Sequence, residues 1–368
     1  MSPLPPALET QLPDKLFRLA TYDYSLPDHL IARYPLDKRS DSRMMRLGRV
    51  SGDITHQRFF SLPDLLQAGD LIVANNTRVL PARLLGHRQG HTGRVEVLLL
   101  YPDTDRSDPN CWLSMTRPTK KLKEGTIIEL PGTSATVEVL TLGEGVRTKV
   151  KLNLQNTPHK TVADLMAAVG HMPIPPYLKR EDEEKDKTTY QTVYAKIPGS
   201  QAAPTAGLHF TPEIIQTLND KGIGFCELTL SVSSGTFKSV DTDDIRNHRM
   251  DPEHYEIGEE TIEKINRTKA NGGRVIAVGT TTLKTLETVA KKHGGQLKAE
   301  AAWSELFIYP GFDFQVVDGL ITNFHLPKTT LLMLISAFAG FENIQEAYRQ
   351  AVTNEYRFFS YGDCMLIV

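Results

Sequence analysis

Short apolar runs alternate with amphipathic stretches along most of the chain. Residues 70–74 and 274–278 are almost continuously apolar, which predicts strands buried on both faces of a sheet. Apolar residues recur every three or four positions after Thr211 and after Glu259, which predicts helices, and Pro212 directly behind Thr211 is typical of a helix start. Similar patterns predict a short helix at 62–66, strands at 225–232, 307–309 and 321–326, helices from Pro327 and from 344 to 356, and a last strand at 364–368 that closes the sheet. Strands that alternate with helices predict an α/β fold with a mixed sheet.

The pattern changes between residues 80 and 154 to short segments separated by turns. From Val146 to Leu152 apolar and charged residues alternate, which is typical of a strand with one face in water. The close spacing of such segments predicts a small β-barrel. Because a buried-type strand precedes this region and a helix capped by Thr161 follows it, we expect the barrel to be inserted into the larger domain. The predicted domains are a discontinuous α/β catalytic domain at 1–78 and 155–368 and an inserted β-barrel domain at 79–154.

Length and charge agree with this two-domain organisation. A chain of 368 residues exceeds the usual size of a single hydrophobic core. The formal net charge of -2 excludes a protein that binds nucleic acid with its whole surface, but a local basic patch is compatible with it. No apolar stretch approaches the roughly 20 residues that span a bilayer, and the N-terminus lacks the basic and apolar regions of a signal peptide. We therefore expect no membrane association and a cytoplasmic protein.

Cysteine and histidine spacing predicts neither disulfides nor a metal site. Cys111, Cys226 and Cys364 lie far apart and form no C-x-x-C, so buried free thiols are expected. His87 and His91 have helix-like spacing, but the glycines around them predict a turn instead.

The stretch from Tyr190 to Phe210 is poor in charge and rich in small residues and proline. Its glycines and prolines give it a shaped and stiff backbone. This composition suits a segment that lies close to a bound ligand and presents Thr205 and His209 to it, with Gly207 between them. The alternative is a buried connection between two domains.

A second candidate ligand site follows the strand at 274–278. Gly279, Thr280 and Thr281 lie between this strand and a helix, where unpaired N–H groups and the helix dipole favour an anion or a ribose. The polar residues 75–78 end the other buried strand, at the place where α/β sheets bind ligands. Ordinary helix capping is the alternative, because the segment lacks the G-x-G-x-x-G of a dinucleotide fold and the G-K-[ST] of a P-loop.

Seven sequence motifs carry a resemblance that extends from about Tyr22 to the end of the chain. They are NNTRVLPARL (75–84), GHMPIPPY (170–177), YQTVYAKIPGSQAAPTAGLHF (190–210), RVIAVGTTTLKTLET (274–288), FIYPGF (307–312), ITNFHLPKTTLLMLISAFAG (321–340) and YRFFSYGDCMLI (356–367). Together and in this order they resemble the S-adenosylmethionine:tRNA ribosyltransferase-isomerase family of queuosine biosynthesis. The resemblance implies an α/β domain that carries an inserted β-barrel, in agreement with the pattern described above.

The resemblance also implies a reaction. The ribosyl part of S-adenosylmethionine is transferred and isomerised onto the aminomethyl group of 7-aminomethyl-7-deazaguanine in the tRNA wobble position, so that epoxyqueuosine forms and adenine and methionine leave. S-Adenosylmethionine is then a consumed co-substrate, and no other cofactor is expected. The implied partners are S-adenosylmethionine and tRNA, and we expect a monomer.

This chemistry needs a base near the C5′ carbon and a hydrogen-bond donor or acid at the departing adenine. An imidazole is the typical base near neutral pH, and His209 and His325 are the candidates, with Asp363 or a tyrosine at the adenine. The alternative interpretation of each histidine is a core residue whose ring is hydrogen-bonded to backbone groups. The alternative interpretation of the aromatic run at 358–361 is packing in the core. The residues expected to bind S-adenosylmethionine are Thr205, Gly207, Gly279, Thr280, Thr281 and Tyr361, the last through cation–π contact with the sulfonium.

Basic residues gather at the start of the predicted barrel and inside it. We expect them to contact tRNA phosphates, since the rest of the chain is close to neutral. The alternative is a solvated barrel edge, where lysine blocks aggregation. The predicted tRNA-binding residues are Arg78, Arg83, Arg117, Lys120, Lys121 and Lys123.

Two runs depart from the family pattern. Ser231 replaces a histidine in the run 230–237, and Asp251 replaces a histidine in the run Met250 to Glu253. These changes keep open an alternative function, that of a tRNA-binding relative without the activity. A methyltransferase that uses S-adenosylmethionine is a third alternative, and the missing glycine-rich loop after the first strand argues against it.

Overall fold

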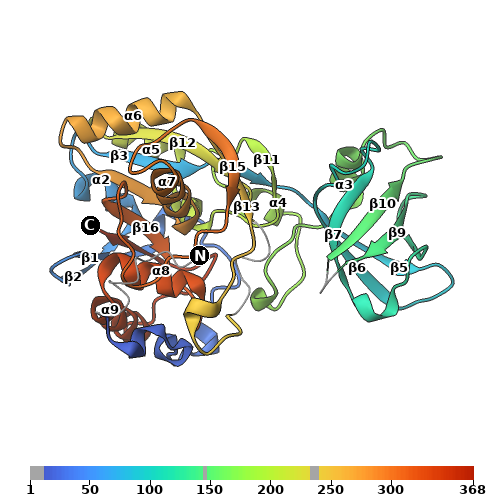
Figure 1. Cartoon of the computed structure of the whole chain (residues 1–368), viewed down its shortest axis with the longest axis horizontal. Helices are drawn as coiled ribbons and strands as arrows, with labels where there is room; N and C mark the ends of the chain where they lie inside the picture. The colour runs from blue at the N-terminus through green and yellow to red at the C-terminus, as the bar shows by residue number, and fades with distance from the viewer. Residues whose placement is uncertain (1–11, 144–146, 233–239) are drawn as a thin grey trace. The chain divides into compact units, whose positions relative to one another are not determined.

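Figure 1 shows the computed structural model of the chain, which describes residues 12–143, 147–232 and 240–368. Contacts between residues divide the chain into two compact units. The predicted barrel insertion at 79–154 lies within the second unit, which also takes in the residues up to Tyr190. The chain passes between the units within β4 (Thr77–Val79) and β11 (Ile197–Ser200). Unit 1 consists of Met1–Thr77, Gln191–Ile197 and Ala203–Val368, and unit 2 consists of Arg78–Tyr190 and Pro198–Ala202.

Nine strands of the described residues form the mixed sheet at the centre of unit 1. They are β1 (Arg43–Leu47), β2 (Ile54–Arg58), β3 (Leu71–Asn75), β12 (Gly224–Leu230), β13 (Glu253–Ile257), β14 (Val275–Val278), β15 (Glu300–Ser304), β16 (Gly319–Asn323) and β17 (Cys364–Ile367). Their order in the sheet is β15-β13-β12-β3-β14-β16-β17-β1-β2. This mixed sheet confirms the predicted α/β class.

One end of this sheet collects chain segments that are far apart in the sequence. β12, β3, β14 and β16 run parallel, so their C-terminal ends meet there. β17 is antiparallel to β16, and β1 is parallel to β17, so Asp363 and Ser42, which precede these two strands, lie at the same end. We call it the carboxyl end of the sheet. Ligands of α/β proteins bind at this end.

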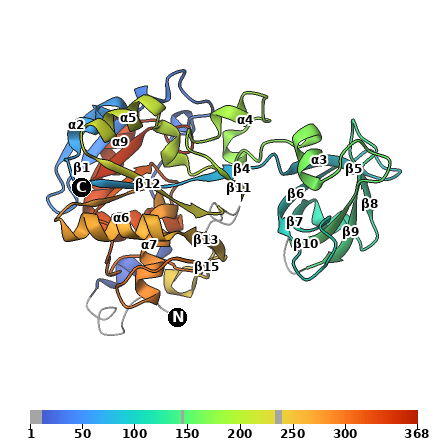
Figure 2. The same ribbon diagram turned by 90° about the horizontal axis from the view of Figure 1, so that it is seen from above.

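Helices cover both faces of the sheet. Figure 2 shows α2 (Leu62–Leu65) and α5 (Pro212–Asp220) on one side of it and α6 (Glu259–Ala270) and α7 (Thr280–Lys292) on the other. The core below α5 contains Ile214 of the helix and Ile72 and Ile276 of the sheet, all buried. The side chain of Thr211 accepts the N–H of Ile214, which confirms the predicted helix start. Two further helices, α8 (Thr330–Ala339) and α9 (Phe341–Thr353), follow β16.

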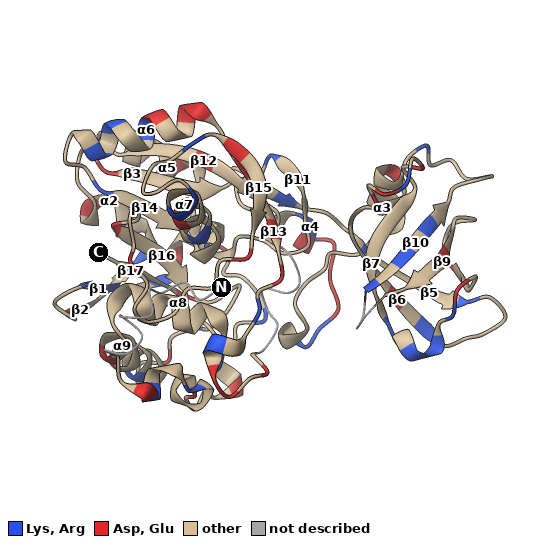
Figure 3. Cartoon of the chain, viewed as in Figure 1, with Lys and Arg blue, Asp and Glu red and all other residues tan. Residues whose placement is uncertain are grey.

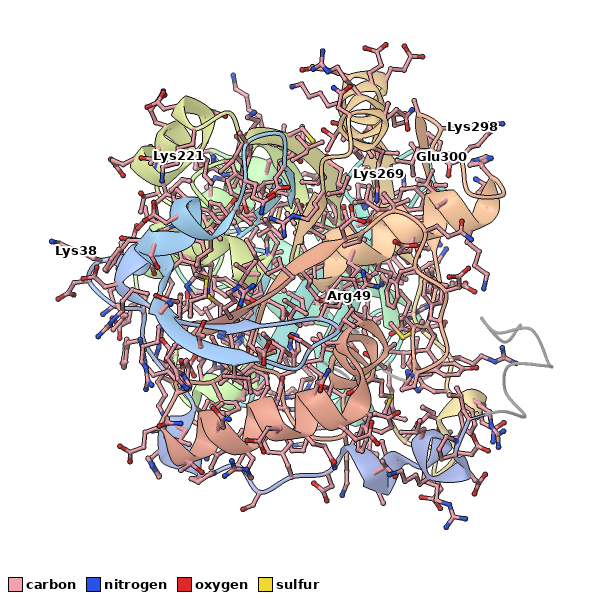
Figure 4. The ribbon with its side chains drawn as sticks, turned by 90° about the vertical axis from the view of Figure 1, so that its left-hand side faces the viewer. Lys38, Arg49, Lys221, Lys269, Lys298 and Glu300 are labelled. Atoms are coloured by element: carbon pink, nitrogen blue, oxygen red, sulfur yellow. The ribbon has the colours of Figure 1, made fainter. Side chains whose placement is uncertain are left out.

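Charged side chains close the opposite end of the sheet. Lys269 and Asp318 form an ion pair at 2.7 Å, and Asp318 also accepts the N–H of Val275 at 2.8 Å. Arg49 donates to the backbone oxygen of Phe338 at 2.9 Å, and its guanidinium lies 4.0 Å from the centroid of that ring. Figure 4 views unit 1 with Arg49 and Lys269 labelled. Polar groups at this end are therefore held by other groups of the protein, which suits a structural role.

Unit 2 contains a closed barrel of six strands, which confirms the predicted barrel. The strands are β5 (Arg83–Arg88), β6 (Arg94–Pro102), β7 (Cys111–Arg117), β8 (Ile127–Glu129), β9 (Thr136–Leu142) and β10 (Arg147–Asn153), in the order β10-β7-β6-β5-β8-β9. Val97, Val137 and Val150 belong to its buried core. Val146 lies outside the described residues. The helices α3 (Val162–Val169), which Thr161 caps as predicted, and α4 (Asp186–Thr189) follow the barrel.

Two strand predictions in unit 1 need correction, and strand β1 was not predicted. The strand predicted at 307–309 is wrong, because that segment is irregular and β15 ends before it. Arg43 begins the unpredicted strand β1, and its guanidinium lies 3.8 Å from the ring centroid of Tyr356. The C-terminal strand does not close the sheet, since β17 lies between β16 and β1.

Cys111, Cys226 and Cys364 are buried and free, as predicted. Across the described ranges, no helix combines the length and the apolar composition needed to cross a membrane. Nor do the described residues contain a group of three or more His, Cys, Asp or Glu side chains placed to hold a metal ion.

Candidate active site

Most of the predicted ligand residues of unit 1 meet at the carboxyl end of the sheet. The 3-10 turn η8 (Thr205–His209) packs against β16 there. A Cβ added to Gly279 would lie 3.7 Å from the Cβ of Ala206, so η8 also lies beside the start of α7. Thr205 is half-buried at the first position of the turn. The two ligand segments expected from the sequence are therefore neighbours in the fold.

His209, the last residue of η8, is buried in a polar cluster. Its Nδ1 lies 2.9 Å from the hydroxyl of Ser42, and its Nε2 lies 3.4 Å from Nδ2 of Asn323. Ser42 donates its own proton to the backbone oxygen of Arg39 at 2.8 Å, so it accepts from Nδ1–H of the imidazole. Nδ2 of Asn323 is a donor, so Nε2 is the accepting nitrogen. These directions assign the neutral tautomer with the proton on Nδ1 and the lone pair on Nε2.

The surroundings of His209 keep its ring neutral. Burial is the main cause that lowers the pKa of His209 from 6.5 to about 4, and the positive charges of Arg39 and Arg357 lower it further. The ring of Phe59 lies 5.2 Å from the imidazole, centroid to centroid, and adds an apolar wall. The imidazole is thus available as a proton acceptor throughout the physiological pH range.

Asn323 and Tyr194 each have a buried polar atom that makes no hydrogen bond to a described residue. In the part of the chain that the structure describes, Oδ1 of Asn323 and the hydroxyl of Tyr194 have no hydrogen-bond partner. Burial raises the pKa of Tyr194 far above its ordinary value, so its hydroxyl stays protonated. Buried polar atoms without a partner are costly, and in a cleft they mark places where ligand atoms bind. The sequence patterns did not single out these two side chains.

Gly207 has a packing reason to lack a side chain. A Cβ at this position would lie 2.1 Å from the hydroxyl oxygen of Tyr194 and 2.8 Å from Cγ2 of Thr192. The close approach of Tyr194 to η8 therefore depends on glycine at position 207.

His325 lies on the other face of β16 from His209. Its Nε2 is 2.8 Å from the hydroxyl of Thr322, whereas Asn323, the next residue along the strand, contacts His209. Successive side chains of a strand point to opposite faces, so the two imidazoles are separated by the sheet. Burial lowers the pKa of His325 to about 3. The N–H of His325 donates to the hydroxyl of Tyr348 at 2.8 Å, which fixes its backbone.

Asp363 binds the backbone at the carboxyl end of the sheet. Its Oδ1 accepts the N–H of Arg43 and its Oδ2 accepts the N–H of Arg357, both at 2.8 Å. Burial raises the pKa of Asp363, against the lowering effect of these two hydrogen bonds. Tyr361 is buried in the turn that precedes Asp363. Both oxygens of Asp363 are thus engaged within the protein.

The start of α7 follows the C-terminal end of β14. Gly279 has a φ of +85°, and within the described residues no side chain caps the first turn of the helix. Thr280 and Thr281 are buried there, and Thr281 lies 3.5 Å from Nδ2 of Asn75 at the end of β3. One turn further along α7, Lys284 forms a buried ion pair with Glu253 of β13. This pair was not expected from the sequence, where its members lie 31 residues apart.

The predicted tRNA-binding residues all belong to unit 2, but they are not equivalent. Arg83 forms ion pairs with Glu96 at 3.0 Å and with Glu181 at 3.2 Å, so its charge is already balanced. Arg78, Arg117, Lys120, Lys121 and Lys123 are exposed. The three lysines form no ion pair with any described residue. Figure 3 shows basic residues in blue at the turn that follows β7, which is η6 (Thr119–Lys121).

Comparison with protein families shows which family the chain belongs to. Residues 19–367 match the family described as queuosine biosynthesis protein. The chain belongs to this family.

Similar proteins of the queuosine biosynthesis family cover almost the whole chain. A protein of Natranaerobius thermophilus named S-adenosylmethionine:tRNA ribosyltransferase-isomerase is 46% identical over 350 residues, 95% of this chain and 99% of its own length. A protein of the same name from Finegoldia magna is 46% identical over 346 residues, 94% of this chain and 97% of its own length. The crystal structure of an S-adenosylmethionine tRNA ribosyltransferase from Thermotoga maritima is 35% identical and covers 95% of this chain and 100% of its own, with a TM-score of 0.52.

The two departures from the queuosine family pattern lie at the carboxyl end of the sheet. Ser231 follows β12, and its N–H donates to the backbone oxygen of His254 at 2.9 Å. Asp251 lies two residues before the start of β13, the strand that pairs with β12. Residues 233–237 of the first departing run lie outside the described residues.

Proposed function

We infer that this chain is an S-adenosylmethionine:tRNA ribosyltransferase-isomerase. It transfers and isomerises the ribosyl moiety of S-adenosylmethionine onto 7-aminomethyl-7-deazaguanine in the tRNA wobble position, and epoxyqueuosine-tRNA, adenine and methionine are the products. The observation that carries this conclusion is the 46% identity to relatives of that name over 95% of the chain. S-Adenosylmethionine is a consumed co-substrate in this scheme. We propose that the enzyme needs no other cofactor and that it is a monomer.

His209 is the proposed proton acceptor at C5′. The reaction requires a base beside the sulfonium, and the lone pair on Nε2 of the neutral imidazole can take the proton. His209 ends η8, the turn whose Ala206 lies beside Gly279 at the start of α7, whereas His325 lies behind β16. The buried position of His209 also keeps water away from the reactive carbon.

The other residues of the carboxyl end bind and orient S-adenosylmethionine in this proposal. The backbone amides of Thr280 and Thr281 face polar groups of the ligand at the start of α7, and Gly279, whose own N–H donates to the backbone oxygen of Ile321 at 2.8 Å, leaves room for the ligand beside them. Oδ1 of Asn323 and the hydroxyl of Tyr194 supply an acceptor and a donor for the ribose hydroxyls or the adenine edge. The wall of the proposed S-adenosylmethionine site is formed by Thr205, Gly207 and Tyr361, and Tyr361 lies near the sulfonium.

Release of adenine tests the function directly. The full chain is incubated with S-adenosylmethionine and a tRNA that carries 7-aminomethyl-7-deazaguanine, and free adenine and modified tRNA are measured. We expect one adenine per modified tRNA, and no adenine when the tRNA carries unmodified guanine. Binding of the tRNA without adenine release would favour the inactive relative, and transfer of a labelled methyl group to tRNA would favour a methyltransferase.

We propose that Lys120, Lys121 and Lys123 contact tRNA phosphates. Replacement of all three by Glu is expected to weaken tRNA binding at least tenfold. The slope of log affinity against log salt should also become shallower, by about 0.9 for each phosphate that the variant no longer neutralises. Filter binding between 50 and 200 mM salt, about the range over which such interactions weaken, measures both effects.

A charge-matched variant controls for the change in net charge. Lys160, Lys221 and Lys298 are exposed and lie away from η6 in the sequence, and Figure 4 labels Lys221 and Lys298 at the surface of unit 1. Their joint replacement by Glu changes the net charge equally. Equal tRNA affinities for the two triple variants would refute the phosphate contacts at η6.

A further inference from the structure

Lys284 and Glu253 form an ion pair that is almost completely withdrawn from water. The side chain of Lys284 is 7% exposed and that of Glu253 is 2% exposed, and Nζ contacts Oε2 directly. Lys284 comes from the second turn of α7, and Glu253 begins β13. A pair of this kind is weak evidence for stability, because desolvation of two charges offsets most of their attraction. Apolar residues of similar volume would connect α7 to β13 at lower cost.

The pair lies at the carboxyl end of the sheet, where the proposed reaction takes place. β13 is antiparallel to β12, with Tyr255 opposite Leu230, so Glu253 extends beyond the C-terminal end of β12. Lys284 lies one turn after Thr280 on α7, and residues four apart share a face of a helix. Both charges therefore belong to the same end of the sheet as Gly279 and η8.

A small cavity adjoins the pair. Its volume is about 20 Å³, and Thr280, Thr281 and Thr330 line it together with Lys284 and Glu253. A volume of this size holds about one water-sized group. The cavity beside the intact pair thus holds one small polar group, whereas a nucleobase or a ribose is too large for it, and a larger polar head enters only when Lys284 and Glu253 separate.

Two helices begin at this cavity. Thr280 is the first residue of α7, which has 13 residues, and Thr330 is the first residue of α8, which has 10 residues. The N-terminal ends of helices carry partial positive charge, and together with the ammonium of Lys284 they favour an anion. Glu253 adds one negative charge at the same place. The lining therefore offers a strong positive site and a single negative site side by side.

We propose that Lys284 and Glu253 bind the amino-acid end of S-adenosylmethionine, Lys284 the α-carboxylate and Glu253 the α-ammonium. This assignment rests on the proposed function. The ligand separates the pair, and each buried charge exchanges its partner for the opposite charge of the ligand. No charge is left uncompensated in the process, which makes the exchange inexpensive despite the burial.

The other parts of S-adenosylmethionine do not fit this lining. The sulfonium is positive and is repelled by Lys284 and by both helix ends. The ribose and adenine are uncharged and need neither member of the pair. With the methionine head at Lys284, the sulfonium and ribose extend past Gly279, where an added Cβ would lie 3.7 Å from the Cβ of Ala206 of η8, toward His209. One ligand thus connects the ion pair to the proposed base.

Substrate analogues that lack one charge test the assignment. Decarboxylated S-adenosylmethionine has the ammonium and the sulfonium but no carboxylate. For Lys284→Met we expect KM for S-adenosylmethionine to rise on the order of 10- to 100-fold, and KM for the decarboxylated analogue to change less than about threefold, because that analogue has no carboxylate for Lys284 to bind. Glu253→Gln is expected to weaken both ligands by similar factors, because both carry the ammonium. Lys284→Arg is expected to restore most of the affinity for S-adenosylmethionine.

The double variant Lys284→Met with Glu253→Gln guards against misfolding, since it leaves no unpaired buried charge. It is expected to fold with a wild-type unfolding midpoint and to bind the natural ligand no better than the analogue. The assignment is refuted if Lys284→Met weakens the binding of both ligands equally. It is also refuted if the double variant binds S-adenosylmethionine as tightly as the wild type.

Equilibrium binding separates this result from a failure of the proposed function. Labelled S-adenosylmethionine and its decarboxylated analogue are dialysed against the full chain in the presence of tRNA that carries unmodified guanine, so that neither ligand is consumed. The affinities of each variant for the two ligands then show whether Lys284 and Glu253 bind the amino-acid end, even if the wild type releases no adenine. Adenine release by the wild type decides the reaction independently of the variants.

Discussion

Replacement of His209 by Ala is expected to lower the rate of adenine release at saturating S-adenosylmethionine by about 10²- to 10⁴-fold, the usual contribution of a general base. The imidazole is buried, its Nδ1–H is held by Ser42, and its Nε2 lone pair is oriented by Asn323. No other described side chain in this cluster is a neutral nitrogen base. His325→Ala is the matched comparison, and we expect it to cost less than tenfold because its ring lies behind β16.

The pH dependence identifies the role of His209. A base must be unprotonated to act, and the pKa of His209 is about 4, so the acid limb of kcat/KM should lie near pH 4 to 5 instead of near 6.5. Activity is therefore expected to be lost only as pH falls through that low value. A residual activity of His209→Gln close to wild type would show that the side chain holds the ligand by hydrogen bonds and moves no proton.

Stability measurements provide the control for folding. Between pH 6.5, the ordinary pKa of histidine, and about pH 4, the unfolded chain binds a proton at His209 that the folded chain does not. The unfolded state then binds more protons, so the free energy of unfolding falls as pH falls through this window, with a slope of about 1.4 kcal/mol per pH unit from this group. His209→Asn should remove the contribution of this group, while the contribution of His325, whose pKa burial lowers to about 3, should remain.

Local sequence patterns predicted those parts of the fold that depend on neighbours in the chain. The buried strand β14, the capped start of α5 and the closely spaced barrel strands all have local signatures, namely apolar runs, a Thr-Pro start and period-two alternation. β1 has no such signature because Arg43 and Arg46 interrupt it, and only the distant ring of Tyr356 explains why a guanidinium is accommodated there. Propensity gives way to tertiary contacts at such positions.

The candidate site was only partly predictable for the same reason. Segments 205–209 and 279–281 have unusual local composition, and they are adjacent in the fold. Ser42 and Asn323, in contrast, are ordinary polar residues in the sequence, and their contacts with His209 span 167 and 114 positions. Side chains joined only by the order of strands in a sheet leave no local pattern, so a single sequence cannot reveal them.

Replacement of Asp363 by Ala is expected to lower the free energy of unfolding by about 2–5 kcal/mol, because it leaves two buried backbone N–H groups without an acceptor. Those groups belong to Arg43 at the start of β1 and to Arg357 at the turn before β17, each 2.8 Å from a carboxylate oxygen. Urea unfolding monitored by tryptophan fluorescence measures this destabilisation. Asp37→Ala, at an exposed position, is the control and should stay within about 0.5 kcal/mol of the wild type.

Asp363→Asn separates this structural role from acid catalysis at the adenine. The amide oxygen keeps one acceptor, while the NH₂ group faces the second backbone N–H, so an intermediate decrease in stability is expected. At a temperature where the variant is fully folded, adenine release should remain within about tenfold of the wild-type rate, since both carboxylate oxygens already serve the backbone. A variant that unfolds like the wild type but releases adenine at least 100 times more slowly, about the effect of removing a general acid, would instead place Asp363 at the reacting atoms.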